Sequence, residues 1–194
     1  MSYQFIEVTS EEQLEKVYAF RYKILDEKDE TRVLLEHCKN RKETDEYDIY
    51  SEHFAAFNEA GEVVAYTRLI HHSPLGYPTE NNMKTNIDKL QLGAEKFAEL
   101  SRIFISEHLR NRKDTRLLIE GLKIIGYNKM AALGIEYTYG ALEKPFLRLL
   151  NMYNLPYQAI GEEQNYATPR YPCLLYTHDL EVANPELLQF RETE

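Results

Sequence analysis

The number and order of short apolar segments most constrain the fold of this chain. Seven segments have strand character: residues 3–8, 53–58, 62–70, 100–106, 135–139, 157–161 and 173–178. The second and third of these flank Ala60-Gly61, which is a signal for a β-hairpin. The pattern predicts a central sheet of about seven strands.

Segments with helical periodicity lie between these strands. Ser10 with Gln13 is typical of the capping box that begins a helix. Asp114 is a candidate N-cap of a long helix that ends at Gly134, and Pro145 favours the start of a further helix. This order of elements predicts an α/β fold, with a mixed sheet flanked by helices.

The chain has 194 residues, which suits one domain with a substantial core. No repeat or linker divides it, so we expect one domain over residues 1–183 and a polar C-terminal tail over residues 184–194. Residues 77–97 lack clear periodicity and are predicted to form a loop, with room for a short helix, and long loops are often functional.

The formal net charge of −9 argues against nucleic-acid binding, which normally needs a basic face. Residues 1–7 lack the pattern of a signal peptide, and no apolar stretch approaches the roughly 20 residues of a membrane span. Cys38 and Cys173 are too few and too far apart for a disulfide framework. We therefore expect a cytoplasmic protein without a membrane span.

Two arginines occupy positions where apolar residues are expected. Arg21 continues the apolar stripe of the first predicted helix, and Arg68 lies inside the apolar strand segment 63–69. A buried guanidinium without a partner costs several kcal/mol, so each needs a carboxylate or a ligand.

Candidate partners lie nearby in the sequence. Asp45 and Asp48 are three residues apart and would share a face on a helical turn, while Glu99 and Arg102 bracket the start of a strand. Three interpretations are open: a structural ion-pair network, an exposed sheet face, or a polar pocket for a small amine in which one carboxylate acts as a base.

Other common chemical motifs are absent from the sequence. The adjacent His71 and His72 would point to opposite faces of a strand, which makes a poor metal site, and we predict no metal. No nucleophile elbow, Walker loop or Cys-x-x-Cys occurs. A basic island stands out in this acidic chain, and it could be a solvated face or a site for an anionic partner: Arg102, Arg110, Arg112, Lys113 and Arg116.

The order of elements resembles the GNAT acyltransferase fold, with residues 100–106 as its fourth strand. The ordered set Arg21, Glu43-x-Asp45-x-x-Asp48, Arg68 and Glu99-x-x-Arg102 resembles the active-site cluster of the acyl-homoserine-lactone synthases, the autoinducer synthases. Further segments resemble long-chain N-acyl amino acid synthases and the acyltransferases associated with PEP-CTERM/exosortase systems: Pro78-Thr79-Glu80, Glu99-Leu100-Ser101-Arg102 and Pro169-Arg170-Tyr171-Pro172.

The chain also departs from these families. Leu25 stands where the homoserine-lactone synthases have an aromatic residue, and the chain has no tryptophan. The resemblance therefore does not extend to that particular acceptor. The glycine-rich pyrophosphate loop of GNAT enzymes is replaced by residues 110–115, which are basic and lack glycine. This favours acyl-carrier protein over coenzyme A as the donor, because basic side chains suit an acidic carrier.

The resemblance implies roles for individual residues. Glu99 would be the catalytic base and Tyr153, near the end of the last predicted helix, the general acid. The fourth strand would hold the thioester carbonyl at Ile103 and Phe104. The remaining candidates fall into two groups. The residues that would bind the amine acceptor are Arg21, Asp45, Asp48, Arg68, Ser101 and Arg102. Those that would bind the donor are Arg110, Arg112, Lys113 and Arg116.

The function implied is transfer of a medium- or long-chain acyl group from acyl-carrier protein or acyl-coenzyme A to a small amine, without a tightly bound cofactor. Two alternatives remain open: an ordinary GNAT acetyltransferase that uses acetyl-coenzyme A, or a non-catalytic sensor or interaction module on the same fold. A long apolar tunnel would favour the fatty donor. A Glu99 that is inaccessible and neutralised by arginines would favour the sensor.

Overall fold

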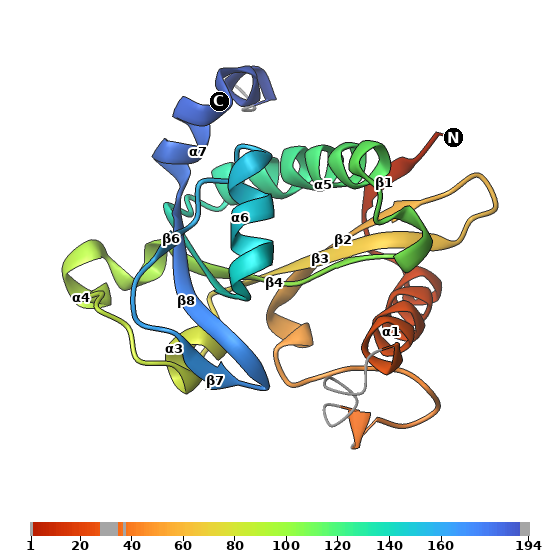
Figure 1. The fold of residues 1–194 in the computed structure, drawn as a ribbon, viewed down its shortest axis with the longest axis horizontal. Coiled ribbons are helices and arrows are strands. Elements are labelled where there is room, and N and C mark those ends of the chain that lie inside the picture. The colour runs from red at the N-terminus through yellow and green to blue at the C-terminus, as the bar shows by residue number, and fades with distance from the viewer. Residues whose placement is uncertain (1, 28–34, 37, 191–194) are drawn as a thin grey trace.

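An eight-stranded sheet runs through the middle of the molecule (Figure 1). The computed structural model describes residues 2–27, 35–36 and 38–190. The strands are β1 (Gln4–Glu7), β2 (Ser51–Phe57), β3 (Val63–His71), β4 (Phe97–Ile105), β5 (Tyr137–Leu142), β6 (Gln158–Ala159), β7 (Gln164–Tyr166) and β8 (Thr168–Tyr176). Their order is β1-β2-β3-β4-β5-β8-β6, and β7 pairs with β8. Strands β4 and β5 are parallel, whereas the other described pairs are antiparallel.

Helices cover both faces of this sheet, as the sequence predicted. Helices α1 and α3 lie below it in Figure 1, and α5 and α6 lie above it. The α-helices are α1 (Glu11–Asp26), α3 (Pro78–Asn82), α4 (Lys89–Leu92), α5 (Arg112–Ala132), α6 (Lys144–Met152) and α7 (Thr177–Ala183). Short 3₁₀ turns are η2 (Asp48–Tyr50), η3 (Ala94–Lys96), η4 (Glu107–Leu109) and η5 (Pro185–Phe190). The α/β prediction is confirmed.

Helix α1 begins as its sequence indicates. The Ser10 side chain accepts a hydrogen bond from the backbone of Gln13, whose own side chain reaches back to complete the capping box. The predicted cap of α5 is wrong, since the helix begins at Arg112, two residues before Asp114. Asn111 is the N-cap, and its side chain accepts hydrogen bonds from the backbone N–H groups of Lys113 and Asp114.

Two other predictions about the elements need correction. Strand β4 begins at Phe97, earlier than predicted, so Glu99 lies within the sheet and does not precede it. The predicted loop 77–97, for which the prediction allowed one short helix, contains two short helices, α3 and α4. Pro78 at the first position of α3 and the Glu80 side chain bonded to the backbone of Tyr77 are the local signals for that short helix. Strand β7, with three residues, is too short to show a period in the sequence.

The segment expected to be a polar tail contains η5, and its Leu187 is fully buried. The Asn184 side chain accepts a hydrogen bond from Lys123 Nζ at 2.5 Å, which ties this segment to α5. Residues 191–194 lie outside the described residues. Of the helices described, none has the length and apolar character needed to cross a membrane.

The core is divided by the sheet. One large apolar cluster lies on the face covered by α5 and α6, and includes Leu118, Leu122 and Leu150. On the opposite face there are two smaller clusters, one under α1 around Val17 and the other near α3 around Phe97. The charged cluster that the sequence singled out around Arg21 and Arg68, together with Glu99, lies on this second face.

Candidate active site

A cluster of ion pairs connects α1 to the sheet. Arg21, on the buried side of α1, has no exposed surface, and its guanidinium lies 2.5 Å from Glu43 Oε2 and 2.6 Å from Asp48 Oδ1. Arg68 of β3 is equally buried and donates to Asp45 and Asp48 at 2.6 and 2.5 Å. Each buried guanidinium is therefore paired with two carboxylates.

Arg102 of β4 completes the cluster from the other side. Its Nη2 lies 2.8 Å from Glu43 Oε1 and 3.2 Å from Asp45 Oδ2. Ser101 joins the same arrangement, because its hydroxyl accepts a hydrogen bond from Arg68 Nε at 2.8 Å. Three arginines and three carboxylates thus balance in charge, and the ion-pair interpretation of these residues is correct. The exposed-face interpretation is wrong for Arg21 and Arg68.

The electrostatics of the cluster favour the ionised form of Glu43 and Asp45. Burial raises the pKa of Glu43, but the guanidinium groups of Arg102 and Arg21 outweigh burial and hold that pKa well below its usual range. The pKa of Asp45 is likewise raised by burial and lowered overall by its hydrogen bonds and charge interaction with Arg68. A charged, rigid wall results.

A second layer of side chains supports this wall from beneath. His53 Nδ1 lies 2.7 Å from the Tyr66 hydroxyl, and its Nε2 lies 3.2 Å from the carbonyl oxygen of Asp48. Both rings are buried. Burial lowers the pKa of His53, which therefore favours the neutral ring in this position.

Glu99 lies on the same face of the sheet but differs from the cluster carboxylates. It is 2% exposed, and Oε2 accepts a hydrogen bond from the backbone N–H of Thr79 in α3 at 2.8 Å. No arginine or lysine among the described residues forms an ion pair with it. Burial raises the pKa of Glu99 to about 7, and the Thr79 N–H opposes this shift only in part. A carboxyl group in this range can exchange protons near neutral pH.

The sheet opens directly after Glu99. Strands β4 and β5 pair over residues Phe97–Glu99 and Tyr137–Tyr139, and no pair is formed beyond Glu99 and Tyr139. Arg102 has a φ of +56°, at a bulge where two β4 residues, Arg102 and Ile103, oppose Thr67 of β3. A bulge of this kind leaves backbone groups outside the ladder. On its other side, β4 has no pairing with β5 beyond Glu99, so its backbone borders the gap between these two strands.

An apolar cavity of about 40 Å³ lies on the opposite face of the sheet, under α5. Leu100 and Ile103 of β4 line it at the sheet, and it extends to Leu180 of α7. Gly126 of α5 also lines it and leaves open space. Lys123 also lines the cavity, and its ammonium group donates a hydrogen bond to Asn184 and forms an ion pair with Glu120. The charged cluster and this cavity thus lie on opposite faces of the sheet, on either side of β4.

Several predicted residues lie elsewhere. The Phe104 side chain packs with the apolar cluster under α1, on the face opposite Ile103, so only its backbone borders the gap. The Tyr153 hydroxyl lies 3.5 Å from the carbonyl oxygen of Arg112, at the N-terminal end of α5, apart from the charged cluster. Met152, the other residue near this position, is 73% exposed.

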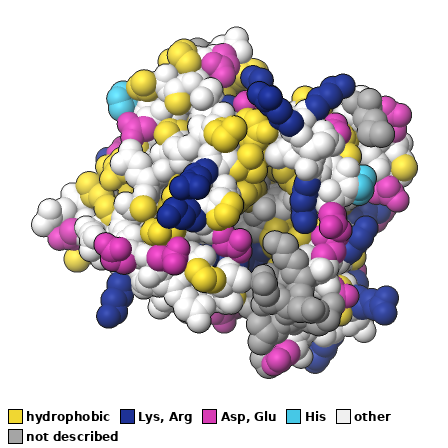
Figure 2. Space-filling model, in the orientation of Figure 1, with side chains coloured by type: hydrophobic (Ala, Val, Ile, Leu, Met, Phe, Trp, Pro, Cys, Tyr) yellow, Lys and Arg dark blue, Asp and Glu magenta, His cyan; other side chains and the backbone are white. Residues whose placement is uncertain are grey.

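The basic island is divided as well. The Arg110 side chain is turned back onto the protein, where it bonds to the Ile105 carbonyl oxygen and pairs with Glu27. Arg112, Lys113 and Arg116 are exposed at the start of α5. Lys and Arg side chains project along the upper part of the surface in Figure 2, on the α5 side of the sheet. Most of the island therefore faces solvent.

The sequence reasoning missed the contribution of α3. Thr79 holds Glu99, yet it lies in the segment predicted to be a loop. The pattern Tyr77-Pro78-Thr79-Glu80 contains proline followed by a glutamate cap and could have indicated a helix start. The support by His53 and Tyr66 has no comparable signal. No group of three or more His, Cys, Asp or Glu side chains suited to a metal occurs in the part of the chain that is described.

Comparison with known proteins agrees with this architecture. The family described as acetyltransferase (GNAT) domain matches residues 20–120, just over half of the chain, including every residue of the charged cluster and Glu99. The chain belongs to the GNAT acetyltransferase family. It is an acyltransferase by this membership, and the predicted GNAT fold is confirmed.

Solved structures similar to this GNAT protein include two acyl-homoserine lactone synthases. A CoA-dependent synthase, BjaI, with SAM and isopentyl-CoA has 17% sequence identity and a TM-score of 0.70, over 96% of this chain and 90% of that chain. The synthase LasI has 16% identity and a TM-score of 0.70, over 100% and 97%. The N-acyl amino acid synthase FeeM, from uncultured soil microbes, has 13% identity and a TM-score of 0.70, over 97% of each chain. At these identities the likeness concerns the fold. No curated protein matches the sequence significantly.

Proposed function

We propose that this GNAT protein is an N-acyltransferase that moves an acyl group from a thioester to the amine of an amino acid or a related small molecule. The observation that carries the proposal is Glu99, a buried carboxyl without an ion-pair partner among the described residues, at the point where β4 and β5 separate. Its pKa of about 7 suits a general base for an amine.

The reaction requires a neutral amine, a polarised carbonyl and a leaving thiol. Glu99 takes the proton of the amine through one water molecule, because the carboxyl itself has little exposed surface. The amine nitrogen then bonds to the thioester carbon, and backbone N–H groups at Arg102 and Ile103 stabilise the oxyanion. The C–S bond breaks and the thiolate takes a proton. Tyr153, which follows α6, is the proposed donor of that proton, since its hydroxyl lies at the N-terminal end of α5, beside Arg112.

The ion-pair cluster orders the acceptor side of this site. Because Arg21, Arg68 and Arg102 are already neutralised by Glu43, Asp45 and Asp48, they present a wall of fixed geometry rather than loose charges. Fixed geometry of this kind contributes to catalysis by holding the amine in line with the carbonyl. The likeness to synthases named for acyl-homoserine lactones and N-acyl amino acids supports an acylated amine as the product.

The donor side favours acyl-carrier protein over coenzyme A. The side chain of Asn111 already occupies the backbone N–H groups of Lys113 and Asp114, and in the preceding turn the N–H groups of Leu109 and Arg110 bond to the carbonyl oxygens of Ser106 and Glu107. These amides are not available to cradle a pyrophosphate. Exposed basic side chains at the start of α5 suit the acidic surface of a carrier in the cytoplasm. No tightly bound cofactor is needed for this chemistry.

The apolar cavity under α5 supports a hydrocarbon chain as the acyl group. Its lining is almost entirely apolar, and it begins at β4, next to the proposed oxyanion site. Its small volume favours a second candidate, a short acyl or acetyl donor, because about 40 Å³ holds only a few water-sized groups. A medium or long chain requires the lining side chains to move.

The experiment compares thioester donors of increasing chain length, on carrier protein and on coenzyme A, with a panel of amines. Free thiol and acylated amine are measured together, so that transfer is separated from hydrolysis. We expect coupled release of both products, with a maximum at a medium or long chain. Turnover with acetyl-coenzyme A alone would favour the second candidate, and absence of transfer from every donor would favour a non-catalytic module. In Glu99→Gln, unchanged turnover in a folded protein would exclude the base role.

A further inference from the structure

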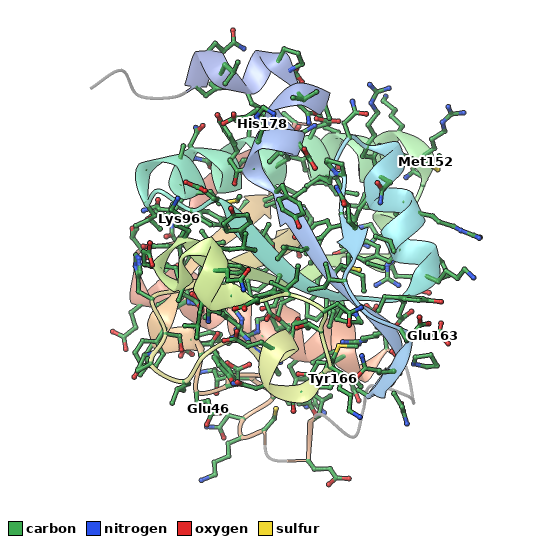
Figure 3. The ribbon with its side chains drawn as sticks, turned by 90° about the vertical axis from the view of Figure 1, so that its left-hand side faces the viewer. Glu46, Lys96, Met152, Glu163, Tyr166 and His178 are labelled. Atoms are coloured by element: carbon green, nitrogen blue, oxygen red, sulfur yellow. The ribbon has the colours of Figure 1, made fainter. Side chains whose placement is uncertain are left out.

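The hairpin of β7 and β8 carries one more cation, Arg170, near the charged cluster. Gln164 pairs with Arg170 and Tyr166 with Thr168 across this hairpin, which turns at Ala167 with a φ of +62°. Figure 3 shows Tyr166 beside α3 and to the right of Glu46, in the lower part of the molecule. The hairpin therefore borders the charged site.

Electrostatics indicate how near the hairpin is to the reaction centre. The charges of Glu99 and Arg102 both influence the Tyr166 hydroxyl, after burial, which is the largest cause of its raised pKa. Burial lowers the pKa of Arg170, the charges of Glu143 and Tyr166 oppose this shift, and the charge of Arg102 lowers the pKa further. In the sheet, β5 lies between β4 and β8, and β4 and β5 pair only as far as Glu99 and Tyr139, so the hairpin lies across the gap from β4.

Arg170 differs from the three arginines of the cluster. No carboxylate among the described residues lies within ion-pair distance of it. Its Nε donates to the Thr168 hydroxyl at 3.1 Å, and its guanidinium carbon lies 5.7 Å from the centre of the Tyr166 ring. The Thr168 hydroxyl donates to Glu143 at 3.0 Å, which fixes the hydroxyl as an acceptor for Arg170. These contacts hold one edge of the guanidinium and leave its terminal nitrogens for a ligand.

The other arginines cannot serve an acidic ligand as well. Arg21 and Arg68 have no exposed surface, and Arg102 already bonds to Glu43 and Asp45. A guanidinium that is partly desolvated and held by an aromatic ring and a hydroxyl is suited to bind a carboxylate with two parallel hydrogen bonds.

We infer that Arg170 binds the carboxylate of an α-amino acid acceptor whose amine faces Glu99. The inference rests on the proposed function and names the class of its acceptor. A zwitterion meets two complementary groups in this arrangement: the carboxyl of Glu99 for its ammonium and the guanidinium of Arg170 for its carboxylate. A simple amine or an α-amide finds only the first of these.

The test compares amino acids with their α-amides, which keep the amine and lose the carboxylate charge. With one thioester donor, we expect the wild type to prefer the acids. Arg170→Gln should raise the KM for the acids by about 10- to 150-fold, the range for loss of a hydrogen-bonded charge, and leave the KM for the amides unchanged. Arg170→Lys should restore part of the preference. Arg148→Gln, on the exposed side of α6, is the matched control.

The outcomes separate this inference from the proposed function. Transfer to acids and amides with equal efficiency by the wild type, or an equal effect of Arg170→Gln on both, would overturn the carboxylate site while leaving the N-acyltransferase in place. No transfer to any amine would remove both. If Arg170→Gln does not fold, as judged by circular dichroism, Thr168→Val releases Arg170 Nε instead, and the same split between acids and amides is expected.

Discussion

The backbone N–H of Thr79 donates to Glu99 Oε2 at 2.8 Å, and this bond joins α3 to β4 at the centre of the site. A neutral donor holds the carboxyl in position without providing a full positive charge. The three carboxylates of the ion-pair cluster, by contrast, each meet guanidinium groups. Two kinds of carboxyl therefore lie on one face of the sheet: those of Glu43 and Asp45, whose pKa is lowered, and that of Glu99, whose pKa is about 7.

This difference predicts how activity depends on pH. A base acts in its deprotonated form, so kcat/KM should fall about tenfold for each pH unit below 7 and level off above it. The measurement is initial thiol release between pH 5 and 9. Glu95→Gln, a nearby exposed substitution, should retain the profile. A profile with the same inflection in active Glu99→Gln would assign the titration to another group.

Glu99 also predicts an unusual dependence of stability on pH. Its folded pKa is raised from 4.5 to about 7, so the folded protein binds this proton more tightly than the unfolded chain does. The contribution is present below pH 4.5 and is lost as pH rises to 7, at up to about 1.4 kcal/mol per pH unit. Denaturant unfolding at pH 5 and 7 should show that Glu99→Gln loses less stability over this interval than the wild type. An identical difference at both pH values would contradict the shift.

Removal of Arg21 should destabilise the protein strongly. Arg21→Met leaves Glu43 and Asp48 buried with fewer partners, and loss of one member of a buried pair typically costs about 3–5 kcal/mol. Lys16→Met removes a cation from the same helix, but that cation pairs with Glu12 at the surface, where the cost is about 1 kcal/mol or less. Urea unfolding of both variants checks the prediction, and equal losses would mean that the cluster adds little to stability.

The sequence indicated the buried charged side chains more directly than the short elements that surround them. Arg21 and Arg68 stood out because a charge interrupts an apolar pattern, and both prove to be buried and paired. Thr79 gave no such signal, because it acts through a backbone N–H that every residue but proline possesses. The separation of Ile103 from Phe104 follows from strand alternation. The gap after Glu99 depends on pairing with β5, which no local pattern encodes.

The exposed start of α5 should affect carrier-protein donors selectively. Lys113→Glu reverses one charge where we expect the carrier to dock, so the KM for an acyl-carrier donor should rise several-fold and that for the matching acyl-coenzyme A much less. Lys96→Glu makes the same change at the opposite end of β4 and should affect neither. The measurement is steady-state kinetics at low and physiological salt, since screening weakens such steering. An equal rise for both donors would contradict docking of a carrier at this end of α5.

Two glycines of α5 differ in the space around them, and one of them, Gly126, tests whether the apolar cavity holds the acyl chain. A Cβ added at Gly126 meets no atom within 4 Å, whereas one at Gly121 would lie 2.2 Å from the Phe5 ring. Gly126→Ala should therefore raise the free energy of unfolding by about 0.5–1 kcal/mol through helix propensity, and Gly121→Ala should lower it by about 1–3 kcal/mol. Gly126 also lines the cavity, so a larger side chain there takes up its volume.

Gly126→Leu should consequently shift the preferred donor toward shorter chains, with kcat/KM for the longest accepted chain falling more than that for acetyl. Gly126→Ala, which adds a single carbon, serves as the matched control with a smaller shift in the same direction. The relevant measurement is the ratio of kcat/KM values across the donor series, because a general loss of folded enzyme lowers every value equally. An unchanged ratio in folded Gly126→Leu would mean that the acyl chain lies elsewhere.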